Sequence, residues 1–180
     1  KFYSKFVKNN KEKMNKATRH RGPDDTGFFL SPKVSLGHNR LSIIDLSSAA
    51  HQPMLSRDNR YAIIYNGELY NFKEIKAELD EYDFFSNSDT EVILYSYAKW
   101  GKECLKKFYG IFSFAIWDKE KEELFMARDQ FGVKPFYYYF ENGKFIFSSE
   151  AKAILIHPEV KRDLNISAFN KYFRFLYVLG

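Results

Sequence analysis

A polar segment, Tyr65–Asn71 (YNGELYN), directly follows an apolar run and contains residues that could stabilise a developing negative charge. Asn66 supplies a neutral side-chain N–H donor, and Gly67 lets a substrate approach the main chain without a Cβ in the way. The end of a rigid strand, where a turn frees N–H groups, is a common place for a site. Fixed donors of this kind form oxyanion holes. The alternative is a plain Asn-Gly hairpin turn between two strands.

Three further side chains would complete a binding site for a free amino acid that carries a side-chain amide. The α-carboxylate needs an arginine fork, which Arg40 would supply at the end of a strand. The α-ammonium needs a carboxylate, which Asp89 or Glu68 would supply. Arg40 could instead only pair with Asp45. Asp89 could be only a helix cap, and Glu68 only a solvated hairpin residue. The match of several residues in type and order favours the binding site.

The elements that position these residues follow from hydrophobic periodicity and turn signals. Asn71 is expected to cap one helix, and Ser88 or Asp89 another. Strands are predicted over residues 26–30, 34–38, 60–65, 110–117, 123–128, 136–140 and 144–148. Helices are predicted over 9–20, 72–79, 90–100 and 149–155, and in an aromatic tail that reaches Gly180. Antiparallel hairpins without strand–helix alternation predict an α+β fold.

Composition describes a globular protein and narrows the classes of partner. The 180 residues suffice for one substantial domain, or for one domain and the start of another. Basic residues dominate positions 1–21, but no nucleic-acid module accompanies them, so a solvated helix face is the better interpretation. No apolar run is long enough to cross a membrane. The single cysteine, Cys104, fits a reducing cytoplasm and is expected to be a small buried residue. The four histidines are scattered and suggest no metal site.

Six short motifs stand in a fixed order along the chain: Arg19–Asp24 (RHRGPD), Gly37–Ile43 (GHNRLSI), His51–Met54 (HQPM), Tyr65–Asn71 (YNGELYN), Ser88–Val92 (SDTEV) and Ala127–Pro135 (ARDQFGVKP). Together they resemble the glutaminase domain of glutamine-hydrolysing asparagine synthetase. That domain is a class II glutamine amidotransferase of the N-terminal-nucleophile hydrolase type. The resemblance covers nearly all of residues 1–160, and six ordered motifs are far more specific than any one of them.

The resemblance implies a fold and a role for each matched residue. The fold would be a four-layer α-β-β-α sandwich of two antiparallel sheets. Asn66 and Gly67 would form the oxyanion hole, Arg40 would hold the glutamine α-carboxylate, and Glu68 and Asp89 would hold the α-ammonium. The full set expected to bind glutamine is Arg40, Leu41, Ile43, Ile44, Glu68 and Asp89.

The resemblance also implies parts that these 180 residues do not contain. The family's nucleophile is an N-terminal cysteine, whose α-amine, with a reference pKa of about 8, can act as its base. The chain begins at Lys1, so we expect a truncated N-terminus and no glutaminase activity from the chain as given. Residues 1–162 would form the amidotransferase domain, and residues 163–180 would begin a C-terminal synthetase domain. ATP, Mg²⁺ and aspartate would bind in that missing domain, and no cofactor is expected in this chain.

The resemblance favours a cytoplasmic asparagine synthetase, which is a ligase, and two alternatives stay open. The intact protein could amidate another carboxylate, such as a sugar acid in surface-polysaccharide synthesis, because acceptor specificity lies in the absent domain. The chain could also be a glutamine-binding domain without catalysis. A Met-Cys start immediately before Lys1 would exclude the second alternative. The expected partners are glutamine and the protein's own synthetase domain, with neither nucleic acid nor membrane; association as a homodimer is left open.

Overall fold

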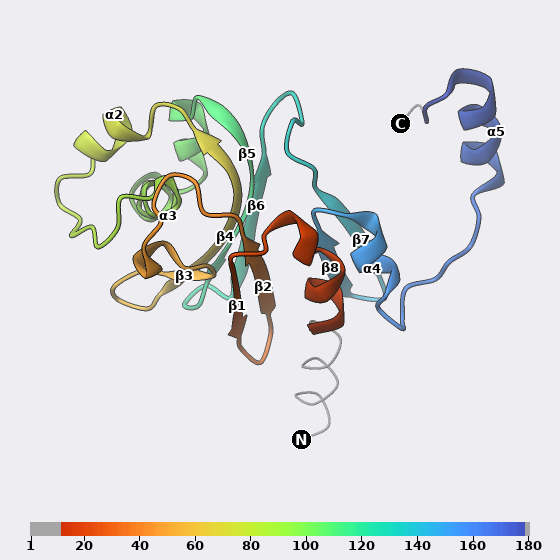
Figure 1. Ribbon diagram of the computed structural model, residues 1–180, viewed down its shortest axis with the longest axis horizontal. Helices are drawn as coiled ribbons and strands as arrows, with labels where there is room; N and C mark the ends of the chain where they lie inside the picture. Colours follow the sequence, from red (N-terminus) through yellow and green to blue (C-terminus); the bar gives the residue numbers. More distant parts are fainter. Residues whose placement is uncertain (1–11, 179–180) are drawn as a thin grey trace.

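A four-stranded antiparallel sheet lies at the centre of the computed structural model, which describes residues 12–178 (Figure 1). Its strands stand in the order β3 (Met54–Leu55), β4 (Tyr61–Leu69), β5 (Gly110–Asp118) and β6 (Glu123–Arg128). β4 and β5 pair along their whole length, and the register places Asn66 opposite Ser113. The residues expected to form the oxyanion hole therefore lie within a central strand.

Helices α2 (Phe72–Ala77) and α3 (Asp89–Trp100) cover one face of this sheet. Because side chains alternate along a strand, Ile63 and Tyr65 of β4 point to this face. They pack there in the larger hydrophobic core with Ile93 of α3. Two 3₁₀ segments, η2 (Ser48–Ala50) and η3 (Gly101–Lys107), connect the surrounding elements.

Two β-hairpins cover the other face of the central sheet. β1 (Asp25–Leu30) pairs with β2 (Ser35–Arg40), and β7 (Tyr137–Glu141) pairs with β8 (Lys144–Ser148). A second apolar cluster joins both hairpins to the central sheet, and its members include Leu36 of β2, Ala62 of β4, Trp117 of β5 and Phe147 of β8. Within the described residues the two hairpins are not hydrogen-bonded to each other.

Helical segments complete the outer layer on the hairpin side. Residues 12–17 are helical and are fastened to β2 through an Asn15–Asn39 hydrogen bond of 3.0 Å, followed by η1 (Arg19–Arg21). α4 (Ala151–Leu155) packs on β7 and β8. The order helix, sheet, hairpins, helix confirms the predicted α+β sandwich (Figure 1). α5 (Ile166–Phe175) stands apart from it and has no buried residue.

The structure corrects three expectations about local structure. β4 continues to Leu69, so the Asn66–Gly67 pair is not a turn, and both the predicted end at residue 65 and the hairpin alternative are wrong. Pairing with β5 outweighs the turn preference of Asn-Gly. Asn71 occupies the N-cap position of α2, but its side chain makes no capping bond, because it bonds the main chain of Lys107 and Tyr109 instead.

The two terminal helices are also shorter than predicted within the described residues. The N-terminal helix ends at residue 17, and the part of the prediction that falls on residues 9–11 lies outside the described residues. α5 ends at Phe175, because Leu176 adopts a left-handed conformation with φ of 60°. The part of that prediction that falls on residues 179–180 lies outside the described residues. Between residues 12 and 178, no helix is both long and apolar enough to cross a membrane.

Candidate functional site

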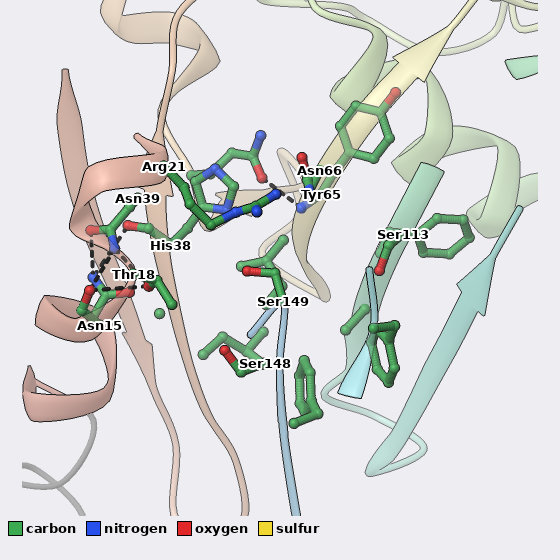
Figure 2. A pocket seen from close by; sticks show the side chains of 18 of the residues that line it. Asn15, Thr18, Arg21, His38, Asn39, Tyr65, Asn66, Ser113, Ser148 and Ser149 are labelled. Atoms are coloured by element: carbon green, nitrogen blue, oxygen red, sulfur yellow. Dashed lines mark hydrogen bonds between the residues drawn. The ribbon is translucent and has the colours of Figure 1, made fainter. Parts of the chain in front are cut away.

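A cavity of about 920 Å³ opens between the central sheet and the two hairpins. Most of the residues expected from the sequence line it: Arg40, Leu41, Ile43, Ile44, Asn66, Gly67 and Asp89. Glu68 does not line it, and its side chain is exposed on β4. Figure 2 shows the cavity from close by, with Arg21 and His38 pointing in from the side of β2 and Asn66 and Ser113 from the central sheet. The fold thus brings together residues that are far apart in the sequence.

The side chain of Asn66 presents an unused donor in this cavity. By strand alternation it lies on the same face as Ala62 and Ile64, the face that looks toward the hairpins. Its Nδ2 atom is buried and has no hydrogen-bond partner among the described residues. Nearly all buried polar groups in folded proteins are paired, so a buried donor without a partner indicates a ligand or a functional role.

The Gly67 N–H points to an open edge of β4. The Tyr65 N–H donates to Gln52 Oε1 (2.7 Å), and the Leu69 N–H donates to Asp89 Oδ2 (3.0 Å). Alternate residues of a strand direct their N–H groups to the same edge, so the Gly67 N–H points to this edge, between those two bonds. β3 pairs only with the first part of β4 and does not cover it. A Cβ at position 67 would overlap main-chain atoms of β5, which explains the glycine.

Arg40 is almost fully buried at the end of β2, with 8% of its surface exposed. Its Nη1 donates to the main-chain oxygen of Ser47 (3.0 Å), and its Nη2 donates to that of Asp45. It forms no ion pair with any residue from 12 to 178; it does contact Asp45, as the alternative expected, but through the main-chain oxygen of that residue. A guanidinium has five N–H donors, and the remaining ones could hold a carboxylate.

Asp89 is the first residue of α3 and is buried, with 4% of its surface exposed. Ser88 is the cap, because its Oγ accepts the Thr90 N–H (3.1 Å). Asp89 Oδ2 accepts hydrogen bonds from the Tyr65 hydroxyl (2.7 Å) and the Leu69 N–H. Burial raises the pKa of Asp89 above its ordinary value, while these hydrogen bonds oppose that shift. A ligand ammonium beside it would offset the cost of burying the carboxylate.

Sequence reasoning did not assign a role to several charged or titratable residues that line the cavity, among them Arg21 and His38. Arg21 lines the cavity and lies 3.5 Å from Glu150, measured from Nη1 to Oε1. His38 precedes Arg40 by two residues on β2, so both side chains lie on one face. Burial, reinforced by the charge of Arg40, lowers the pKa of His38 to about 4, so its ring is neutral at neutral pH. The two-residue period of a strand would have placed His38 on the same face as Arg40. His38 was missed because the four histidines were considered only as possible metal ligands.

Cys104 takes no part in the site. It lies in η3, is fully buried and does not line the cavity. Burial raises the pKa of its thiol to about 12, so almost no thiolate forms at neutral pH. The expectation of a small buried residue is confirmed.

Comparisons with known proteins agree with this geometry. A family model described as a glutamine amidotransferase domain matches residues 3–179. Asparagine synthetase [glutamine-hydrolyzing] 3 of Bacillus subtilis is 42% identical over 90% of this chain and 27% of its own length. Asparagine synthetase [glutamine-hydrolyzing] 2 of the same organism is 41% identical over 84% of this chain and 20% of its own length. Asparagine synthetase B of Escherichia coli is 40% identical over 79% of this chain and 26% of its own length. The chain therefore spans about a quarter of these relatives, and it belongs to the glutamine amidotransferase domain family.

Proposed function

We propose that this chain binds L-glutamine and forms the glutaminase part of a glutamine-hydrolysing asparagine synthetase. The observation that carries the proposal is the pair of unused donors at Asn66 Nδ2 and the Gly67 N–H. Both lie in a cavity that also holds the buried guanidinium of Arg40 and the buried carboxylate of Asp89. One cation, one anion and two neutral donors are the groups that a free L-glutamine needs.

Each group then has a role in amide hydrolysis. Arg40 would bind the α-carboxylate and Asp89 the α-ammonium, which places the side-chain amide at the donors. A cysteine thiolate at the family's N-terminal position attacks the amide carbon, and the carbonyl oxygen becomes an oxyanion. Asn66 and Gly67 donate hydrogen bonds to it. The C–N bond breaks, the cysteine's proton leaves with ammonia, and water hydrolyses the thioester to glutamate.

The intact protein would use the ammonia in a second domain. The names of the relatives, and the fact that the matched part is only 20–27% of the length of each, support a synthetase domain that amidates aspartate with ATP and Mg²⁺. Residues 163–180, which include α5, would begin that domain after the amidotransferase domain of residues 1–162. The reaction would take place in the cytoplasm. Glu68, exposed at the end of β4, would contribute to ammonium binding only after a change in its surroundings.

Kinetics of the intact protein test the proposal. Glutamate release from L-glutamine is expected without any acceptor, and asparagine formation is expected when aspartate, ATP and Mg²⁺ are added. Absence of glutamate release from a folded intact protein would refute the glutaminase assignment. Glutamate release without asparagine formation would refute only the assignment of aspartate as the acceptor.

A further inference from the structure

A loop that lacks helix and strand, residues 41–47, forms the wall of the cavity beside Arg40. Its start is held by Asp24, whose Oδ2 accepts the Ser42 N–H (2.8 Å). Its end is held by Arg40, whose guanidinium donates to main-chain oxygens of Asp45 and Ser47. The position of the guanidinium and the position of the loop therefore depend on each other.

A second loop, residues 85–88, directly precedes Asp89, and its last residue, Ser88, also lines the cavity. Glu91 of α3 is fully buried and holds this loop to the helix. Its carboxylate accepts the Phe85 N–H (3.0 Å), the Ser86 N–H (2.8 Å) and the Ser86 hydroxyl (2.6 Å). Because of these bonds the loop is fixed relative to α3, and so relative to Asp89.

The carboxylate of Asp45 connects the two loops. Its Oδ1 accepts the Ser47 N–H (2.8 Å) within its own loop, and its Oδ2 accepts the Asn87 N–H (2.9 Å) from the other. In the part of the chain that the structure describes, this is the only hydrogen bond between the two loops. Hydrogen bonds from Ser47 and Asn87 lower the pKa of Asp45, so it stays ionised at neutral pH. Each of its two oxygens thus accepts one hydrogen bond from a main-chain donor.

We propose that Asp45 is a positioning residue that fixes the separation between Arg40 and Asp89, and so sets recognition of the two α-groups of the amino acid. The inference rests on the proposed function. The carboxylate and ammonium of an α-amino acid are bonded to the same carbon, so their separation is set by covalent geometry. A site that binds both groups must hold its own cation and anion at a matching distance before the ligand binds. The Asp45 bridge is the direct hydrogen bond between the loop that Arg40 holds and the loop that precedes Asp89.

Two substitutions weaken the Asp45 bridge to different degrees. Asp45→Asn keeps one oxygen acceptor, and Asp45→Ala keeps none. In the intact protein we expect the KM for L-glutamine to rise several-fold for Asp45→Asn and about tenfold or more for Asp45→Ala, on the scale of one hydrogen bond to a charged group. The kcat should stay within about threefold, because the donors of β4 do not touch the bridge. The kcat/KM for glutaramate, which is glutamine without its α-amino group, should fall less, because glutaramate has no ammonium for Asp89 to bind.

A matched control distinguishes positioning from general loss of structure. Asp58 also holds a loop through its carboxylate, which accepts the Arg60 N–H (3.0 Å) and the Ser56 hydroxyl (2.5 Å), but it does not line the cavity. Asp58→Asn should leave the preference for L-glutamine over glutaramate unchanged. Faster amide hydrogen exchange at Asn87 in the Asp45 variants would report loss of the bridge itself.

The measured quantity is the ratio of kcat/KM for L-glutamine to that for glutaramate. A ratio that falls in both Asp45 variants but not in Asp58→Asn supports the positioning role. An unchanged ratio in Asp45→Asn, with faster exchange at Asn87, overturns it while the proposed function stands. Failure of the folded wild-type protein to release glutamate refutes the proposed function, and with it this role of the bridge.

Discussion

Replacing Asn66 by alanine should separate catalysis from stability. The Nδ2 atom is buried without a partner among the described residues, so its removal strands no other group. The main-chain pairing of β4 with β5 is retained, since it does not involve the side chain. We therefore expect the free energy of unfolding to change by less than about 1 kcal/mol. The loss of one oxyanion donor should nevertheless reduce kcat by about 10²–10³, or roughly 2.7–4 kcal/mol in the barrier.

The assay compares Asn66→Ala with Gln52→Ala in the intact protein. Gln52 Oε1 accepts the buried Tyr65 N–H, and its Nε2 donates to Thr90 Oγ1 (3.3 Å). Its removal leaves a buried donor unsatisfied, which should cost about 1–3 kcal/mol in urea unfolding. Asn66→Ala should show the opposite pattern, with a large loss of glutamate release and little loss of stability. A variant Asn66→Ala that keeps kcat within about threefold of wild type would refute the reasoning.

Three further outcomes are expected. Gly67→Ala should lower the free energy of unfolding by about 1–3 kcal/mol, because its Cβ would come within 2.8 Å of Phe112 Cα; urea unfolding measures this, and a stability equal to wild type would contradict the packing. Arg40→Lys should raise the KM for L-glutamine about tenfold with a smaller change in kcat, since an ammonium cannot replace the fork; an unchanged KM in steady-state kinetics would argue against carboxylate binding at Arg40. The pKa of His38 is about 4 in the folded chain and 6.5 in the reference state, so the unfolded chain binds more protons between these two pH values. The free energy of unfolding should therefore fall as the pH drops from 6.5 to 4. Urea unfolding of His38→Gln should show a shallower fall, and pH profiles identical to wild type would exclude His38 as the cause of the fall.

Local patterns predicted much of the β structure correctly. The expected strands 123–128 and 144–148 match β6 and β8 residue for residue, because each is a short apolar run bounded by turn signals. The motif residues Arg40, Asn66 and Asp89 do line one cavity, as the amino-acid chemistry suggested. The strand matches depend on short segments of sequence, whereas the meeting of Arg40, Asn66 and Asp89 depends on the whole fold.

The remaining features depend on contacts between distant segments. An Asn-Gly pair signals a turn locally, but the partner strand β5, more than 40 residues away in the sequence, extends β4 through Gly67. The link between Asp45 and Asn87 also joins two loops that carry no mutual sequence signal. His38 was missed for a different reason, because its significance comes from burial beside Arg40 and not from its spacing to other histidines.

The two halves of the cavity differ in how easily they could change during evolution. The oxyanion donors belong to β4, and any shift of that strand would have to break its ladder with β5. The residues that would recognise the amino acid lie on or next to two loops, which one described hydrogen bond, between Asp45 and Asn87, joins to each other. Substitutions in residues 41–47 and 85–88 could therefore retune which amide is accepted while leaving the hydrolytic chemistry intact. A search for altered substrate preference should begin in those two loops and leave the central sheet unchanged.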